Sequence, residues 1–392
     1  MKQYLDMLRH VIDNGTSTDD RTGTGTYSVF GYQTRYNLDE GFPLATTCST
    51  PLRWIIEELL WMRDGKTNNE DLLAVGVDIW KEWALPEEAT LSIVGHKNET
   101  DLILELARVQ RWPLSRARNE VMVKRQQLQS DEFGNEALDT WLRSLGVEPF
   151  NTAKFQKGEL GPIYGAQWRD FGGVDQLKDL VQRLRDRPFS RRHVVTAWNP
   201  EVLPDEGVSH AENVLAGRAV LASCHAFFQC HCRKLSLKRR CEISAQHGLS
   251  VEYSDYFTSD DDERFEGAQD KLEAILNIGS VPTIGLTLQM YQRSCDVCCG
   301  ARFNIAFYSA LTMFLAHELG YHPEEFIHDI GDLHIYKNHV SNALKQLERT
   351  PHTLPKLRIK ARRGTSIFDL TYKDLELTGY KPEPKIVYPI SI

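Results

Sequence analysis

The feature that most constrains the fold is a short segment in which apolar residues alternate strictly with others. Apolar side chains occupy every second position from Ile284 to Met290, with Gly, Thr and Gln between them. A period of two places the apolar side chains on one face of a β-strand. The segment therefore predicts a half-buried strand, which is stable only as part of a larger sheet.

Helical and strand patterns interleave elsewhere without a regular βαβ rhythm. Apolar residues recur at helical spacing over about 2–14, 51–64, 174–187 and 303–320. Further strands are predicted at about 193–198 and 219–231. This order predicts an α+β (α/β) fold, a mixed β-sheet flanked by helices.

Composition excludes several classes of protein. The chain has 392 residues, 41% of them hydrophobic, and a net charge of −8. Disordered, collagenous and coiled-coil chains are disfavoured, and a protein that coats nucleic acid is usually basic. We expect no membrane-spanning segment, no membrane partner and no direct nucleic-acid partner. The N-terminus predicts an amphipathic helix rather than a signal peptide, so we expect a cytoplasmic protein with free cysteines.

Two stretches are predicted to be insertions into a single catalytic domain over residues 1–392. Residues 86–157 are charged and largely helical in pattern, which predicts a small helical subdomain. Residues 233–282 contain a basic run at 238–240 and an acidic run at 260–263. Charge runs of this kind are most often solvated surface, and the sequence does not say what either insertion does.

The chemistry is concentrated in two segments. Cys224 lies in Ser-Cys-His-Ala-Phe-Phe-Gln, and Arg293 lies in Tyr-Gln-Arg-Ser-Cys-Asp-Val. A cysteine on a strand is more often a small buried apolar residue than a nucleophile. An arginine near a thiol changes that balance because a cation favours the thiolate.

These two segments resemble the thymidylate synthase family, and so do others in the same order along roughly two thirds of the chain. The further matching segments are Asp20–Thr26, Gly41–Leu44, Glu58–Trp61, Ile79–Trp83, Leu160–Gly165, Ser190–Arg192, Ala197–Asn199, Phe303–Ala306 and Gly331–Tyr336. The resemblance implies a thymidylate-synthase-like sheet, with the two insertions outside the matching segments.

The resemblance implies roles for matching residues at a pyrimidine deoxynucleotide. Cys224 would attack carbon 6, which makes carbon 5 nucleophilic. Glu58 would organise water and proton transfers, and Tyr164 would help to remove the carbon 5 proton. Arg293 and Asp296 complete the catalytic set.

The remaining implied contacts divide between the nucleotide and a folate. The expected substrate-binding residues are Arg21, Arg191, Arg192, Arg293, Ser294, Asp296, Asn304, His334 and Tyr336. The expected cofactor-binding residues are Ile79, Trp80, Trp83, Asp296, Gly300, Phe303 and Ile392. Asn304 favours dUMP over dCMP because an amide offers both a donor and an acceptor to uracil. In the family, the paired arginines reach the other subunit, which implies a homodimer. The co-substrate would be methylenetetrahydrofolate, and no metal is expected.

Several residues depart from the family pattern on the folate side. Cys48 stands where a lysine is usual, Ser223 replaces a proline, and Cys298, Cys299 and Arg302 replace generally apolar residues. The departures and the chain length are similar to phage deoxyuridylate hydroxymethylases, which would imply 5-hydroxymethyl-dUMP as product and host cytoplasm as location. A water-tolerant folate pocket would produce this outcome.

Three other interpretations remain. The nearest is methylation of dUMP to dTMP with formation of dihydrofolate, which Trp80 favours because the methyl-forming enzymes use a tryptophan there. A zinc-dependent nucleic-acid-binding regulator would rest on the cysteines between Cys230 and Cys299, but these do not form two CxxC pairs. An inactive homologue is disfavoured by the intact set of Cys224, Glu58, Arg293 and Asn304.

Overall fold

A computed structural model describes residues 1–20, 23–87, 89–96, 99–128, 136–260 and 262–389. Two predicted site residues, Arg21 and Ile392, lie outside the described residues. The helices are α1 (Lys2–Asn14), α2 (Leu52–Arg63), α3 (Asn69–Leu73), α4 (Glu99–Gln110), α5 (Leu114–Leu128), α6 (Glu136–Ser144), α7 (Tyr164–Arg169), α8 (Gln176–Asp186), α9 (His210–Leu215), α10 (Leu237–Ser244), α11 (Ala268–Ile278), α12 (Arg302–Leu319) and α13 (Val340–Leu347). The strands are β1 (Thr16–Thr18), β2 (Thr26–Asn37), β3 (Ala89–His96), β4 (Phe150–Phe155), β5 (Val194–Thr196), β6 (His225–Lys234), β7 (Phe257–Ser259), β8 (Asp262–Glu263), β9 (Ile284–Asp296), β10 (His322–Tyr336), β11 (Lys356–Ile359) and β12 (Leu375–Thr378).

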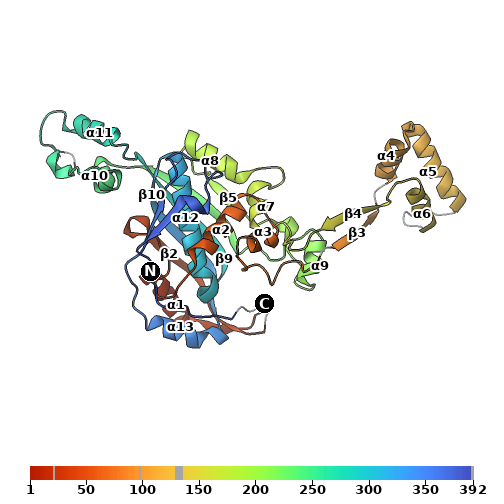
Figure 1. The fold of residues 1–392 in the computed structure, drawn as a ribbon, viewed down its shortest axis with the longest axis horizontal. Helices are drawn as coiled ribbons and strands as arrows, with labels where there is room; N and C mark the ends of the chain where they lie inside the picture. Colours follow the sequence, from red (N-terminus) through yellow and green to blue (C-terminus); the bar gives the residue numbers. More distant parts are fainter. Residues whose placement is uncertain (21–22, 88, 97–98, 129–135, 261, 390–392) are drawn as a thin grey trace.

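A six-stranded mixed sheet forms the centre of the protein, in the order β1-β2-β10-β9-β6-β5. The β9–β10 pair is parallel, and the other neighbours are antiparallel. The long helix α12 packs on β9 and β10 and also contacts α2 (Figure 1). The expected mixed sheet flanked by helices is confirmed.

The local patterns predicted most of these elements. The four predicted helices correspond to α1, α2, α8 and α12, and the alternating segment begins β9. The prediction of a strand from residue 219 was wrong, because β6 begins at His225. The preceding backbone turns away from the sheet, since the Ala219 and Val220 amides donate to Val202 O and Leu160 O. Strands β2 and β10 were missed, and β2 has no regular alternation of buried and exposed residues.

We expected no segment that is long and apolar enough to span a bilayer. Judged by length and composition alone, that expectation was wrong. Among the described residues, Val297–Leu319 is long and apolar enough for that test, but 72% of its most apolar window is buried inside the protein. Phe307, Leu311 and Phe314 on this helix are at most 1% exposed. Burial of this extent indicates the central helix of a core.

Residues within the two charged stretches pack around small cores of their own. Helices α4, α5 and α6 enclose one cluster that includes Leu106 and Leu142, at the end of the β3–β4 arm (Figure 1). Leu272 and Phe257 belong to a second cluster around α10 and α11, which project on the opposite side of the sheet. Arg239 of α10 pairs with Asp39, which ties this region to the sheet.

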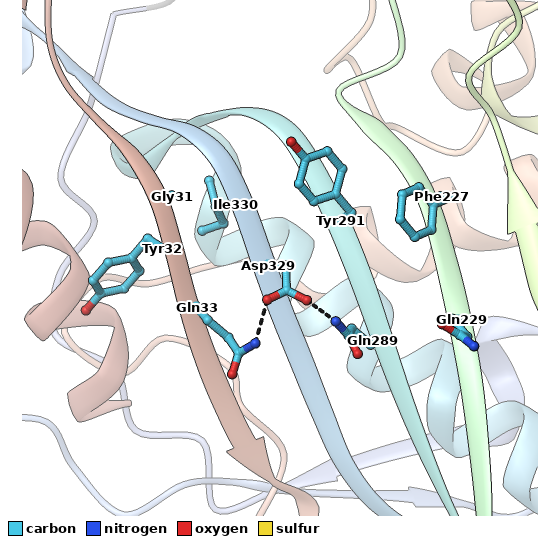
Figure 2. Close-up of a pocket in the computed structure, with 9 residues that line it drawn as sticks. All are labelled: Gly31, Tyr32, Gln33, Phe227, Gln229, Gln289, Tyr291, Asp329 and Ile330. Carbon is cyan, nitrogen blue, oxygen red and sulfur yellow. Dashed lines mark hydrogen bonds between the residues drawn. The ribbon is translucent and has the colours of Figure 1, made fainter. Parts of the chain in front are cut away.

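The face of the sheet shown in Figure 2 carries polar and aromatic side chains at the surface. They line a shallow depression of about 580 Å³ between β2, β10, β9 and β6. Asp329 accepts hydrogen bonds from Gln33 and Gln289, and Phe227 stacks on Tyr291 with ring centroids 5.6 Å apart. Nearby Phe30 is 84% exposed. Exposed aromatic side chains grouped on one sheet face are typical of a contact surface.

Candidate active site

Cys224 is positioned by the pairing of β6 with β9, immediately before the first residue of β6. Its carbonyl accepts a hydrogen bond from the Arg293 amide at 2.7 Å, and its own amide donates to the Tyr164 hydroxyl at 2.9 Å. The Cys224 Sγ lies 4.0 Å from Nη2 of Arg293. The structure therefore brings together three of the residues that the sequence singled out.

Arg293 is held in place by groups other than a carboxylate. Its guanidinium donates to the Ala222 carbonyl at 3.3 Å and lies 5.6 Å from the ring of Trp198. The hydroxyl of Ser223, at a position where the family usually has proline, donates to Ala197 O at 2.9 Å. These contacts fix the backbone of residues 222–224 next to the arginine.

The pKa of the Cys224 thiol is raised, which the sequence did not anticipate. Burial raises this pKa, while the charge of Arg293 and the hydroxyl of Tyr164 lower it. The arginine therefore acts in the expected direction, but desolvation outweighs it. The thiol is the dominant form in the protein without ligands, so the anion has to develop during the reaction.

Cys224 and Arg293 line a cavity of about 420 Å³. Predicted residues Ser294, His334 and Tyr336 also line it. Among its described lining residues, Arg293 is the single lysine or arginine beside five aspartates or glutamates. An anion in this cavity therefore needs further positive charge from outside the described lining.

Arg191 and Arg192 do not line the cavity of their own chain. Both side chains are exposed between α8 and β5. The Arg191 carbonyl accepts a hydrogen bond from Gln229, a residue of the open sheet face, at 3.2 Å. The backbone of Arg191 thus adjoins Gln229, one of the residues of the sheet face in Figure 2.

Glu58 is a carboxyl group whose acidity is strongly altered by the fold. It is half-buried on α2, and burial raises its pKa to about 7, against a smaller lowering by Trp80. Trp80 Nε1 donates to Glu58 Oε1 at 2.8 Å. The sequence named both residues but did not predict this bond, because the two residues are on separate segments of the chain.

A chain of amide contacts determines the orientation of Asn304. Gln292 Nε2 donates to the Ser294 carbonyl at 3.0 Å, which turns Gln292 Oε1 inward. That oxygen lies 2.8 Å from His328 Nε2 and accepts from Asn304 Nδ2 at 3.0 Å. Asn304 also makes a side-chain hydrogen bond that raises the pKa of His225, so its oxygen, with two lone pairs, keeps one for a further donor.

Two buried histidines near the hydrogen bonds of Gln292 and Asn304 are neutral. Burial lowers the pKa of His328 to about 3, and burial lowers that of His225 to about 4, against a smaller effect of Asn304. A neutral His328 must carry its proton on Nε2 to donate to Gln292. The sequence reasoning missed His225, Gln292 and His328; the first two lie inside the quoted motifs, whereas His328 has no local signal.

Asp296 begins a different part of the site. Its carboxylate accepts from the amides of Cys298 and Cys299 at 2.8 and 3.2 Å, which caps a π-helical turn over Val297–Ala301. Predicted residue Gly300 lies in this turn, and Phe303 follows it in α12. π-turns inside helices frequently mark functional sites.

His339, which the sequence reasoning also missed, faces Asp296. Its Nδ1 lies 3.8 Å from Asp296 Oδ1, and the ligand atoms of Asp296, Cys299 and His339 all lie within 4.8 Å of one another. Burial lowers the pKa of the His339 imidazole, whereas Asp296 raises it. The net effect is a pKa above the usual value of histidine. The Asp296 carboxylate therefore stabilises the charged form of the imidazole, and this form pairs with a carboxylate rather than with a metal ion.

The predicted tryptophans meet edge-on, and Trp80 contacts Glu58. The ring of Trp80 lies 5.9 Å from that of Trp83 and 6.1 Å from that of Tyr164. Ile79 is next to Trp80 and half-buried. Together these side chains form an aromatic wall adjoining Tyr164, which contacts Cys224.

The pair of strands β6 and β9 aligns a thiol with an arginine, and contacts through Tyr164 and Trp80 connect this pair to the half-buried Glu58. The chain belongs to the thymidylate synthase family. The sequence model of that family, described as Thymidylate synthase, matches residues 2–254 and 274–392. The family transfers one carbon unit to dUMP and uses methylenetetrahydrofolate as co-substrate.

Curated relatives carry the same family name. The chain is 37% identical over 397 residues to the thymidylate synthase of Listeria monocytogenes serovar 1/2a, and the match covers all of both chains. It is also 37% identical over 399 residues to the thymidylate synthase of Listeria innocua serovar 6a, again over the full length of both.

The acidity of Glu58 predicts how stability changes with pH. Its pKa rises from 4.5 to about 7 on folding, so the folded state holds the proton more tightly. Its contribution to stability should therefore fall as pH rises from 4.5 toward 7 and stay constant above that. Glu58→Gln should gain thermal stability relative to the unmodified protein over this window, as measured by calorimetry. The matched control is Glu57→Gln on the same helix; an equal pH-dependent gain there would contradict the assignment.

Proposed function

We propose that this protein transfers the one-carbon unit of methylenetetrahydrofolate to carbon 5 of dUMP and that water completes the reaction, giving 5-hydroxymethyl-dUMP. The overall reaction consumes dUMP, methylenetetrahydrofolate and water and releases tetrahydrofolate. The observation that carries the proposal is the distribution of departures from the family pattern. Apart from Ser223, which adjoins Cys224, the departures gather on the folate side, while the residues proposed to contact the nucleotide match the family.

Cys224 is the proposed nucleophile for carbon 6. Its thiol loses a proton as the sulfur–carbon bond forms, and Arg293, 4.0 Å away, stabilises the developing anion. Tyr164 accepts a hydrogen bond from the Cys224 amide and is proposed to assist removal of the carbon 5 proton. Glu58, with a pKa of about 7, can both hold and release a proton near neutral pH. Asp296 completes the proposed catalytic set.

Asn304 is the proposed reader of the base. Its nitrogen donates to Gln292, and we propose that its oxygen accepts from the N3–H of uracil. Cytosine presents an unprotonated N3 at that position, so two acceptors would face each other. His334 and Tyr336, which line the cavity, are proposed to bind the sugar hydroxyl.

We propose that the phosphate is bound by arginines from two subunits. Arg293 and Ser294 come from the cavity itself, and Arg21 belongs to the same proposed set. Arg191 and Arg192 would come from the partner of a homodimer formed through the sheet face of Figure 2. The scarcity of described cations in the cavity supports this arrangement, because a phosphate dianion needs several donors.

Methylenetetrahydrofolate supplies the carbon unit when bound, and the chain offers groups that fit it. The aromatic wall of Trp80 and Trp83, with Ile79, suits a flat ring system, and Asp296 suits its N–H donors. Gly300 and Phe303 follow Asp296, and Ile392 is proposed to close over the folate.

The folate side supports water as the final reactant. Arg302, Cys298 and Cys299 replace generally apolar residues around the turn that follows Asp296. Such changes alter how tightly the pocket excludes water. The second candidate is methylation to dTMP, which the position of Trp80 against Glu58 favours.

We also propose that residues 86–157 and 233–282 are insertions into one catalytic domain, as their separate cores suggest. A cytoplasmic location, including host cytoplasm for a phage-encoded chain, is part of the same proposal.

Product analysis tests the proposal directly. The purified protein is incubated with dUMP and methylenetetrahydrofolate, and the nucleotide is identified by mass spectrometry. We expect 5-hydroxymethyl-dUMP without the absorbance change of dihydrofolate. Formation of dTMP with dihydrofolate would refute the hydroxymethyl product.

The role of Cys224 is tested by adduct formation. Cys224→Ala should abolish the covalent adduct with 5-fluoro-dUMP, whereas the control Cys241→Ala should retain it. A full adduct in Cys224→Ala would refute the assignment of the nucleophile.

Base selectivity tests the role of Asn304. Asn304→Asp should shift the ratio of kcat/KM for dCMP over dUMP upward by about 10- to 100-fold, because one mismatched hydrogen bond costs roughly 1–3 kcal/mol. The control is Asn14→Asp, an exposed amide on α1, which should leave the ratio unchanged. An unaltered ratio in Asn304→Asp would mean that another group reads the base.

Mixed dimers test the shared site. Cys224→Ala and the double variant Arg191→Ala, Arg192→Ala should each be nearly inactive alone. After subunit exchange, some mixed dimers contain one site with both an intact Cys224 and the partner's intact arginine pair, so activity should return. Sedimentation should show a dimer. Absence of any recovery in verified mixed dimers would contradict the cross-subunit role.

A further inference from the structure

Arg302 is a buried cation with no carboxylate partner among the described ion pairs. It is 6% exposed at the start of α12, and its Nε has no hydrogen-bond partner. Its Nη1 donates to the sulfur of Cys48 at 2.8 Å, and its guanidinium lies 5.7 Å from the ring of Tyr388. Burying a guanidinium is costly unless its contacts compensate. The groups that Arg302 contacts are therefore expected to offset the cost of its burial.

Cys48 connects Arg302 to the C-terminal segment. The side chain is completely buried, and its sulfur also accepts from the amide of Ile386 at 3.3 Å. The neighbouring backbone extends this contact, since Ser49 N donates to Glu383 O and Glu383 N donates to Thr46 O. One sulfur thus joins the beginning of α12 to the segment 383–389.

Tyr388 closes the network from the other side. Its ring faces Arg302, and its hydroxyl donates to Gln346 Oε1 at 2.7 Å. Gln346 in turn donates to Thr47 Oγ1 at 3.1 Å, next to Cys48. The contacts form a closed ring through residues 47–48, 302, 346 and 386–388.

The end of this segment reaches the folate side of the site. The carbonyl of Pro389 lies 2.6 Å from His339 Nε2, and the ring of Tyr388 packs edge-on against His339 at 5.3 Å. The other ring nitrogen of His339 faces Asp296 at 3.8 Å. The position of residues 386–389 therefore influences the orientation of the Asp296 carboxylate through His339.

We propose that Arg302, Cys48 and Tyr388 form a latch that holds residues 383–389 against the folate side of the site and thereby positions Asp296 for the pterin ring. The proposal rests on the proposed function, because Asp296 is assigned to folate there. These are positioning residues that do not touch the nucleotide. Loosening the latch weakens binding of the folate while leaving binding of dUMP unchanged.

A matched pair at residue 48 tests the latch. Cys48→Ala removes the acceptor for Arg302 and Ile386, whereas Cys48→Ser keeps an acceptor atom. We expect Cys48→Ala to raise the KM for methylenetetrahydrofolate by about tenfold, the effect of losing roughly 1.4 kcal/mol of contact energy, and Cys48→Ser to recover most of the loss. Binding of dUMP, measured by calorimetry without folate, should stay unchanged. Equal weakening of both ligands, or of neither, would overturn the proposal.

Hydrogen exchange provides a readout that does not depend on activity. Amides of residues 383–389 should exchange faster in Cys48→Ala and in Arg302→Leu, without a comparable change in the central sheet. Tyr388→Phe, which removes the hydroxyl that donates to Gln346, serves if Arg302→Leu does not fold. The control is Cys241→Ala, in α10 and outside this network. Unchanged exchange in Cys48→Ala and Tyr388→Phe would refute the latch, even if the protein forms the expected product. Faster exchange in a protein that forms no folate-dependent product would refute only the proposed function.

Discussion

The hydrogen bond from the Arg293 amide to the Cys224 carbonyl is the contact on which the nucleotide site depends. It belongs to the antiparallel pairing of β6 and β9, which joins residues 69 positions apart in the chain. A strand register fixes every side chain along it at once. The same register pairs His225 with Gln292, and the parallel pairing of β9 with β10 sets His334 opposite Asp296.

Burial then sets the chemistry that this geometry can perform. Desolvation raises the pKa of Cys224 and of Glu58, and it lowers the pKa of His225 and His328. In each case the neutral form is favoured, as expected for groups removed from water. The proposed reading of the base by Asn304 therefore depends on neutral dipoles, whose orientation is set from the Ser294 carbonyl through Gln292 to Asn304. Arg293 supplies positive charge at the cavity where a reaction intermediate and a phosphate would need it.

The folate side is organised differently, because contacts with the C-terminal segment dominate there. Cys48, Arg302 and Tyr388 are far apart in the sequence, and each is unremarkable as a single residue. In the structure the sulfur, the guanidinium and the ring are in direct contact. A change at any one of these residues alters the contacts of the other two. The departures from the family pattern are therefore best understood as a group. Coupled contacts of this kind are not additive.

The sequence by itself determined the elements whose signal is local. The periods of α1, α2, α8, α12 and the first part of β9 were readable because burial of one face requires a regular spacing. The order of motifs also indicated the family and most of the proposed site residues, including Cys224, Glu58 and Asn304. Only the tertiary structure decided that β6 begins at His225, that Trp80 binds Glu58 and that His328 orients Asn304 through Gln292. These outcomes depend on partners distant in the chain, and a local pattern carries no information about the dielectric or the hydrogen-bond partners that a side chain meets after folding.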